Sequence, residues 1–139
     1  MTVTFCGHSK IEYYTTVSNL LYIHIENLIK NGADIFLIGS YGEFDFLAAK
    51  TVKSLKDKYP HIKSINIIPY KNKKTNYFLF DCVEYPMLDN IHPKYAIIKS
   101  NEYMVDKADV VISYIRRDTG GAFKTFAYAK KKRKDVILV

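Results

Sequence analysis

Short apolar runs alternate with longer amphipathic stretches along this chain. Five runs, at 3–7, 34–39, 64–70, 110–115 and 135–139, are apolar almost throughout. Runs of this length without polar alternation are typical of strands that are buried on both faces of a sheet. The pattern therefore predicts about five strands, each followed by a turn rich in glycine or polar residues.

The stretches between these runs repeat their apolar residues at intervals of three and four, as one face of a helix does. Stop signals such as Asn31-Gly32 and Pro60 limit them, and Pro93 is well placed in a first helical turn. The expected helices are about 11–31, one through Leu47 and Leu55 that ends before Pro60, one from Pro93 through Ala108, and 120–134.

This alternation of strands and helices predicts an α/β fold. We expect a Rossmann-like three-layer sandwich, with a mostly parallel sheet of about five strands and helices on both faces, forming a single domain over residues 1–139. The aromatic-rich segment 71–92 has no clear period and predicts either a short helix or a loop that packs its rings over the site. In such sheets, ligands bind beyond the carboxyl ends of the strands.

Glycines gather at these predicted strand ends. Tight turns between strand and helix use glycine in any case, but glycine also lets a ligand approach the backbone, next to the free N–H groups of a helix start. Three such turns on one edge favour a binding site. The glycines of these turns are Gly7, Gly39, Gly42, Gly120 and Gly121.

The turn after the second predicted strand carries two carboxylates, Glu43 and Asp45, beside Ser40 and Tyr41. A carboxylate at this position binds the vicinal hydroxyls of a ribose, serves as a general base, or caps the following helix. We interpret Glu43 as the ligand-binding or catalytic residue. Asp45 fits the capping role better, and binding is its alternative.

Polar side chains follow two other strands. His8 lies in the first turn, where it is available to a phosphate or a base, or is simply a surface histidine. Arg116 and Arg117 precede a turn of Thr119 and two glycines at a helix start, and arginine with backbone N–H donors suits phosphate. We interpret Arg116 as a ligand-binding residue, and one of the two arginines is alternatively a surface charge paired with Asp118. Asn101, within the third helix, is expected to be a structural tether rather than a ligand contact.

Composition limits the cellular location of the protein and the kinds of site it contains. The 139 residues contain no apolar stretch near the roughly 18 residues that a membrane helix needs, and the first ten lack the features of a secretory signal, so we predict a cytoplasmic protein without membrane contact. Cys6 and Cys82 are far apart and have no metal-ligand spacing. We predict neither a metal site nor a cofactor.

The formal charge of +7 raises nucleic acid as a partner. The excess lies largely in two clusters, 71–74 and 130–134. The second of these is at the end of a predicted helix, where cations complement the helix dipole. Nucleic acid therefore stays the less favoured partner.

Several segments together resemble a known group of proteins. In chain order these segments are "TFCGHSKI", "GSYGEFDFLAA", "INIIPY", "KSNEYMVDKADVVISYI" and "TGGAFKTFAYAKKK". They resemble small bacterial Rossmann-like proteins of the SLOG superfamily, which takes in Smf-type DNA-processing proteins and Lonely Guy phosphoribohydrolases. The resemblance implies a nucleotide or nucleotide-derived ligand at Gly39, Gly42, Glu43, Gly120 and Gly121. It does not extend to the "PGGxGTxxE" motif of the Lonely Guy enzymes, because Thr119 replaces the proline and no glutamate follows.

Three functions follow as hypotheses. The first is a sensor or sequestering module for a nucleotide or nucleotide-derived molecule, with arginine on the phosphate, Glu43 on the ribose, and Tyr41 or Tyr70 stacked on the base. The second is an enzyme that cleaves or transfers an N-glycosidic bond, with Glu43 as its catalytic carboxylate. The third is nucleic-acid binding through the Lys/Arg clusters. We also expect a homodimer.

Overall fold

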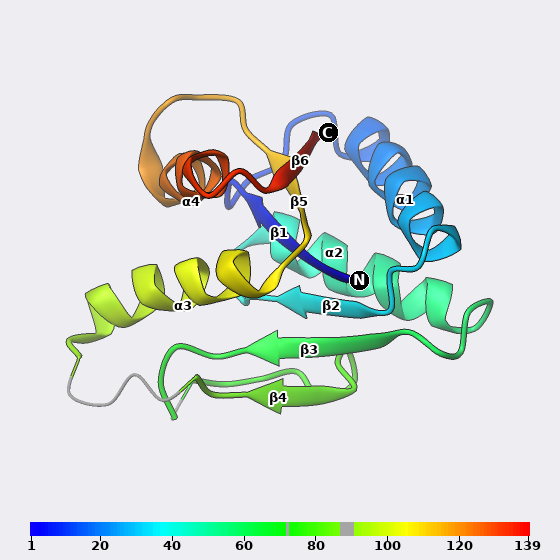
Figure 1. The fold of residues 1–139 in the computed structure, drawn as a ribbon, viewed down its shortest axis with the longest axis horizontal. Coiled ribbons are helices and arrows are strands. Elements are labelled where there is room, and N and C mark those ends of the chain that lie inside the picture. The colour runs from blue at the N-terminus through cyan, green and yellow to red at the C-terminus, as the bar shows by residue number, and fades with distance from the viewer. Residues whose placement is uncertain (72, 87–90) are drawn as a thin grey trace.

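The computed structural model describes residues 1–71, 73–86 and 91–139, and it contains a six-stranded sheet in which every neighbouring pair is parallel (Figure 1). The five predicted strands are present and a sixth is added. The predicted α/β Rossmann-like fold is therefore confirmed. The strands are β1 (Thr2–Gly7), β2 (Ile35–Ile38), β3 (Lys63–Ile67), β4 (Cys82–Glu84), β5 (Val110–Tyr114) and β6 (Asp135–Leu138).

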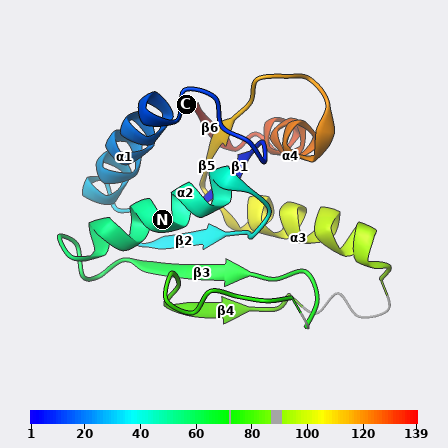
Figure 2. The ribbon, with the colours of Figure 1, turned by 180° about the vertical axis from the view of Figure 1, so that it is seen from behind.

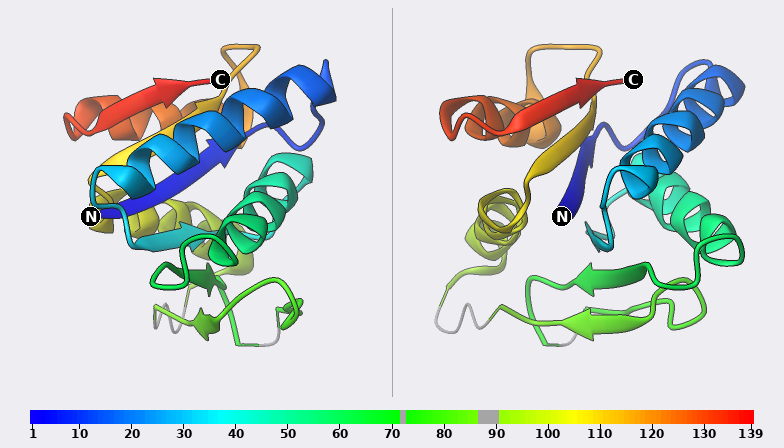
Figure 3. Two further views of the ribbon diagram at one scale, coloured as in Figure 1. Left: turned by 90° about the vertical axis from the view of Figure 1, so that its right-hand side faces the viewer. Right: turned by 45° about the vertical axis from the view of Figure 1, so that its right-hand side comes forward.

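Helices cover both faces of the sheet. One pair packs together on one face and the other pair on the opposite face, which makes the three predicted layers (Figures 1 and 2). The right panel of Figure 3 shows the sheet between the two pairs. The first pair is α1 (Tyr14–Lys30) and α2 (Glu43–Lys56), and the second is α3 (Pro93–Lys107) and α4 (Gly120–Lys131).

The strand order, β4-β3-β2-β1-β5-β6, determines where a ligand site is expected. From β1 the chain moves outward through β2 to β3 and β4, and α3 then carries it back to β5 on the other side of β1. Val3 therefore pairs with Phe36 on one side and with Val110 on the other. The direction of winding changes between β1 and β5, so the ligand rule for open sheets points to their carboxyl ends.

Side-chain alternation along β1 divides the core between the two faces. Phe5 belongs to the cluster under α1 and α2, where it stacks on Phe36 with ring centroids 6.4 Å apart, while Cys6 belongs to the cluster under α3 and α4. Gly7 ends the strand against the ring of Phe44: a Cβ there would lie 2.3 Å from that ring. The glycine allows α2 to pack closely on β1.

The described residues of the segment 71–92 form no helix and are mostly loop, one of the two expected alternatives, but they also contain a short strand. Among its described residues, Cys82–Glu84 form β4, which pairs with β3 and makes an edge of the sheet. Residues 72 and 87–90 lie outside the described part of the chain. Within that part, no helix is both long enough and apolar enough to cross a membrane.

Candidate functional site

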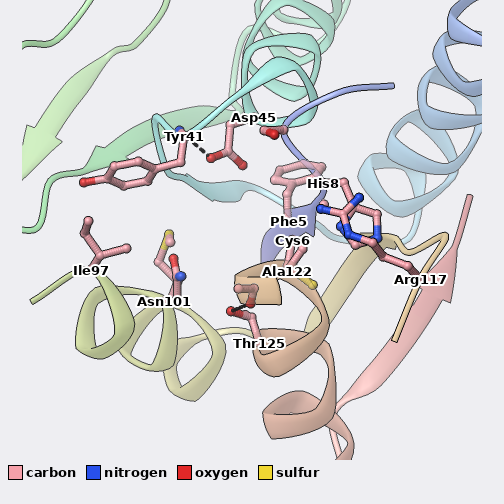
Figure 4. A pocket seen from close by; sticks show the side chains of 14 residues that line it. Phe5, Cys6, His8, Tyr41, Asp45, Ile97, Asn101, Arg117, Ala122 and Thr125 are labelled. Atoms are coloured by element: carbon pink, nitrogen blue, oxygen red, sulfur yellow. Dashed lines mark hydrogen bonds between the residues drawn. The ribbon is translucent and has the colours of Figure 1, made fainter. Parts of the chain in front are cut away.

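A cavity of about 250 Å³ lies at the carboxyl ends of β1 and β5, the position that the strand order indicates (Figure 4). Its walls come from the turns after three strands and from α3 and α4. The described residues that line it are Phe5, Cys6, Gly7, His8, Ser9, Tyr41, Asp45, Ile97, Asn101, Met104, Arg117, Gly121, Ala122 and Thr125.

His8 is a buried part of this wall and not a surface histidine. Its Nε2 accepts a hydrogen bond of 3.0 Å from the backbone N–H of Arg116, so this nitrogen carries no proton. Burial lowers the pKa of His8, and the nearby Arg117 and Arg116 lower it further. A neutral His8 therefore fixes the turn after β5 against the turn after β1.

The two arginines of the turn after β5 have different positions. The Arg116 guanidinium lies over the Tyr114 ring, 4.3 Å from its centroid, and donates to the Val139 carbonyl, so it is not part of the cavity wall. Arg117 lines the cavity, next to His8 in Figure 4. The sequence favoured Arg116 as the ligand residue, and the structure places its neighbour there.

The first turn of α4 faces the cavity beside Arg117. Thr119 is the N-cap residue, but its side chain forms no capping hydrogen bond. Gly120 has φ +90°, and a Cβ on it would lie 3.8 Å from Arg117 Nη2, so the guanidinium sits beside this helix start. Gly121 lines the cavity with open space where its side chain would be. Arginine and helix N–H groups together favour an anion.

Asp45 forms the opposite wall, in the first turn of α2. Its Oδ2 accepts a hydrogen bond of 2.9 Å from the backbone N–H of Tyr41, which holds the turn after β2 (Figure 4). Burial raises the pKa of Asp45 to about 6, against the opposing effect of the Tyr41 N–H. The hydrogen bond of Asp45 goes to Tyr41, which precedes α2, and not to an N–H group of the first helical turn, so the expected capping role is not seen. The carboxyl group does face the cavity, and its binding role stays a prediction.

Glu43 lies outside the described lining of this cavity. Its exposed carboxylate accepts a hydrogen bond of 2.7 Å from the Ile11 N–H, and its own N–H donates to the Ser9 carbonyl over 2.8 Å. These two bonds connect α2 to the turn after β1. The geometry therefore gives Glu43 a structural contact, and Asp45 is the carboxyl group that reaches the cavity.

The wall from α3 was not expected from the sequence. The Asn101 amide points toward the cavity in Figure 4, and it forms no hydrogen bond within the described part of the chain. The expected role of a tether is thus not seen. Across from Ile97 lies the Tyr41 ring, whose buried hydroxyl lacks a hydrogen-bond partner among the described residues. Burial and the neighbouring Tyr70 raise the pKa of Tyr41.

Cys6 also lines the cavity, and it was not predicted as a site residue. Its thiol lies 3.0 Å from the Ser113 hydroxyl. Burial raises the pKa of Cys6 to about 12, so the thiol stays protonated at neutral pH. A protonated thiol is a poor nucleophile, and Cys6 serves as part of the wall.

The other predicted residues of the turn after β2 face a second hollow. Gly39, Ser40 and Gly42 line a volume of about 300 Å³ on the far side of Asp45, which borders both spaces. Gly42 has φ +135°, and a Cβ there would lie 2.5 Å from Ser9 Cα. Glycine is therefore needed at position 42, because a side chain would be strained at this φ and would clash with Ser9. Tyr70 lies outside the described lining of both spaces.

The cavity is therefore polarised. Arg117 and the start of α4 form a cationic side, whereas Asp45 and the Asn101 amide form a side with hydrogen-bonding groups for neutral polar atoms. In the described part of the chain, no group of three or more His, Cys, Asp or Glu side chains is arranged to hold a metal ion. The arrangement fits a ligand with an anionic end and a hydroxyl- or amide-bearing end.

The fold has solved relatives. DNA processing protein A from Helicobacter pylori, described for its single-stranded DNA binding mode, matches with a TM-score of 0.73 at 17% identity, over 99% of this chain and 64% of that one. DNA processing protein A from Streptococcus pneumoniae matches with a TM-score of 0.75 at 18% identity, over 99% of this chain and 49% of that one. This chain thus spans less than two thirds of either protein.

The family assignment comes from sequence. No curated protein matches the chain significantly. The YspA SLOG family, however, matches residues 7–136, from the end of β1 into β6, so all the turns around the cavity are included. The expected SLOG membership is therefore confirmed, and the chain belongs to the YspA SLOG family.

Proposed function

We propose that the protein is a binding module for a nucleotide or nucleotide-derived small molecule, held in the cavity at the ends of β1 and β5. One observation carries this proposal: Arg117 and the start of α4 face the cavity from one side, and the Asn101 amide, unpartnered among the described residues, faces it from another. Phosphate suits the first side, because guanidinium and helix N–H groups form charge-assisted hydrogen bonds with it.

The remaining wall suits the rest of such a ligand. Asp45 accepts hydrogen bonds from ribose hydroxyls, the Asn101 amide pairs with the polar edge of a base, and the Tyr41 ring offers a stacking surface. A volume of about 250 Å³ lies just below the usual range of small-molecule sites, which begins at roughly 300 Å³. We therefore favour a mononucleotide or a ribose phosphate over a larger ligand.

Two variants test this site by isothermal titration calorimetry, after a thermal-shift screen with nucleoside monophosphates, nucleosides, ribose 5-phosphate and NAD derivatives. Arg117→Ala should weaken binding of the best phosphate-bearing probe by about 10- to 100-fold, the range for removal of a hydrogen bond to a charged group. The matched control is Lys131→Ala, which removes a cation from the far end of α4. Equal affinity of Arg117→Ala and wild type would overturn the proposal.

Asn101→Leu separates binding from structure. The Asn101 side chain makes no hydrogen bond in the described part of the chain, so we expect an unchanged or higher melting temperature together with an affinity at least about fivefold lower. A structural tether would instead show a lower melting temperature. Wild-type affinity in this variant would remove Asn101 from the site.

An N-glycosidic hydrolase or transferase remains the enzymatic alternative. Such chemistry needs a carboxyl group beside the sugar, and within the described lining that group is Asp45, whose pKa of about 6 suits a general acid. We therefore assign this alternative to Asp45 in place of Glu43. Mass spectrometry of the titrated samples decides the matter: a released base that disappears in Asp45→Asn but persists in Glu43→Gln would establish the enzyme.

Nucleic-acid binding is a second candidate. The Helicobacter pylori relative is described for its single-stranded DNA binding mode, and the present chain carries a formal charge of +7. Binding to labelled single strands should weaken steeply as salt rises, because phosphate contacts release counterions. Arg117→Ala should have little effect on it if the nucleic acid lies elsewhere on the surface.

A further inference from the structure

Three hollows share residues of α2 and of the segment 74–81. Figure 2 shows α2 on the face of the sheet opposite α3 and α4. Their volumes are about 660, 300 and 270 Å³, and Leu79 lines all three. One wall is α2 with the turn before it, and the segment 74–81 lies opposite. The hollow of about 300 Å³ is the one already described beside Gly39, and it shares Asp45 with the cavity at β1 and β5. We call this surface the α2 groove.

Lysines dominate the charge of the α2 groove. Lys50, Lys53 and Lys56 recur every three residues along α2, and Lys74 lies on the opposite wall. Lys56 forms a 2.6 Å ion pair with Asp81, but Lys50 has no acidic partner among the described residues. Three carboxylates, Asp45, Asp57 and Asp81, line the same hollows as the four lysines, so the groove keeps a small excess of positive charge.

Aromatic rings stand beside these lysines. Tyr77 is 77% exposed, Phe78 86% and Phe46 49%. The Lys50 ammonium lies 4.7 Å from the Phe46 ring centroid, and Lys53 donates a hydrogen bond to the Phe78 carbonyl, which joins the two walls. Exposed rings gathered in one place, unlike single scattered ones, indicate an interaction surface.

We propose that the α2 groove binds single-stranded nucleic acid, an inference that rests on the second candidate function and specifies its surface. Exposed rings next to cations form the arrangement that non-specific single-strand binders use, because bases stack on the rings while lysines contact the phosphates. A duplex keeps its bases stacked on one another and offers the rings no open base faces. The cavity at β1 and β5 takes no part.

The aromatic half of the proposal is tested by fluorescence anisotropy with a labelled oligothymidylate of about 12 nucleotides, within the site sizes of single-strand binders. The double variant Tyr77→Ser and Phe78→Ser should weaken binding at least about tenfold. Both side chains are exposed, so their removal leaves the fold intact, and the melting temperature verifies this. Tyr95→Ser is the matched control, an exposed ring on α3 outside the groove.

The contribution of the lysines is tested with the double variant Lys50→Gln and Lys74→Gln. Neither substitution removes an ion pair found among the described residues. The slope of log affinity against log salt should become shallower by about 0.7 for each phosphate that a lysine no longer neutralises. Lys131→Gln, on α4, should leave that slope unchanged.

The outcomes separate this inference from the candidate function. If the oligothymidylate binds and the groove variants match wild type, the surface is wrong while nucleic-acid binding stands. If it does not bind at low salt, both are overturned. If labelled duplex of the same length binds as tightly as the single strand, stacking on the exposed rings is overturned. Weaker binding in the groove variants alone, with both controls unchanged, supports the inference.

Discussion

At the residue scale, Asp45 combines a structural hydrogen bond with a place in the wall of the candidate site. It holds the turn after β2 through the Tyr41 N–H, and it borders both the cavity at β1 and β5 and the hollow beside Gly39. A Cβ on Gly39 would lie 3.0 Å from Asp45 Oδ2, so this glycine leaves room for the carboxyl group. The burial of that carboxyl group costs stability whenever it is ionised.

The pKa of Asp45 gives a prediction with a defined sign. Because the folded protein binds this proton with a pKa of about 6, above the ordinary value of 3.8, the contribution of Asp45 to stability falls as pH rises from about 4 to about 6. Asp45→Asn should therefore raise the free energy of unfolding above pH 6, by up to about 3 kcal/mol, with the difference vanishing below pH 4. Urea titrations at several pH values measure this.

The control for that series is Asp118→Asn, which removes an exposed carboxylate from the turn before α4. It should leave the pH dependence of the unfolding free energy unchanged. If Asp45→Asn were less stable than wild type at pH 7, the hydrogen bond from Tyr41 would outweigh the burial of charge, and the argument from burial would fail.

At the scale of elements, two glycines that the sequence places in turns after strands have opposite surroundings in the structure. Gly7 ends β1 against Phe44, with no room for a Cβ, whereas Gly121 lies in the first turn of α4 with open space around it. Gly7→Ala should lower the free energy of unfolding by about 1–3 kcal/mol through overpacking. Gly121→Ala should raise it by up to about 1 kcal/mol through helix propensity. Denaturant titrations of both variants test this contrast, and a similar decrease in both would contradict it.

The elements themselves were predictable where periodicity was strong. Five apolar runs and four helical patterns became strands and helices, and Pro93 begins α3 as expected, with His92 as its N-cap. The strand β4 was missed because its three residues are each only partly buried, so neither an apolar run nor an alternation marks them. The periodicity of apolar residues reflects which of them are buried, and the residues of this short edge strand are only partly buried.

The candidate site was only partly predictable for a related reason. The strand ends were identified correctly as the edge that surrounds the cavity, because glycine turns follow directly from sequence. Which of two adjacent side chains turns inward depends on tertiary contacts: Arg116 is drawn to the Tyr114 ring and the Val139 carbonyl, which leaves Arg117 at the cavity. Asn101 reaches the site from a helix distant in sequence. Its one available signal was a polar residue on an otherwise apolar face.

At the scale of the whole molecule, the distribution of charge distinguishes the two surfaces to which we assign different ligands. The cavity at β1 and β5 combines Arg117 with Asp45, so its charges nearly balance, whereas the α2 groove gathers lysines beside exposed rings. A small anionic ligand and a long anionic polymer would thus meet different faces of the protein. For this reason Arg117→Ala should have little effect on nucleic-acid binding in the α2 groove.

The net charge also predicts how salt affects folding. A formal charge of +7 repels itself in the compact state, and the ion pairs among the described residues all include a partner at least partly exposed to solvent, so they contribute little. Raising NaCl from about 0.01 to about 0.3 M at pH 7 should therefore increase the melting temperature, since the Debye length falls below the spacing of most surface charges. Near pH 9.3, the isoelectric point of the sequence, the repulsion is neutralised and the salt effect should disappear. Differential scanning calorimetry across both variables measures this, and a melting temperature that falls with salt at pH 7 would show that local ion pairs outweigh the repulsion.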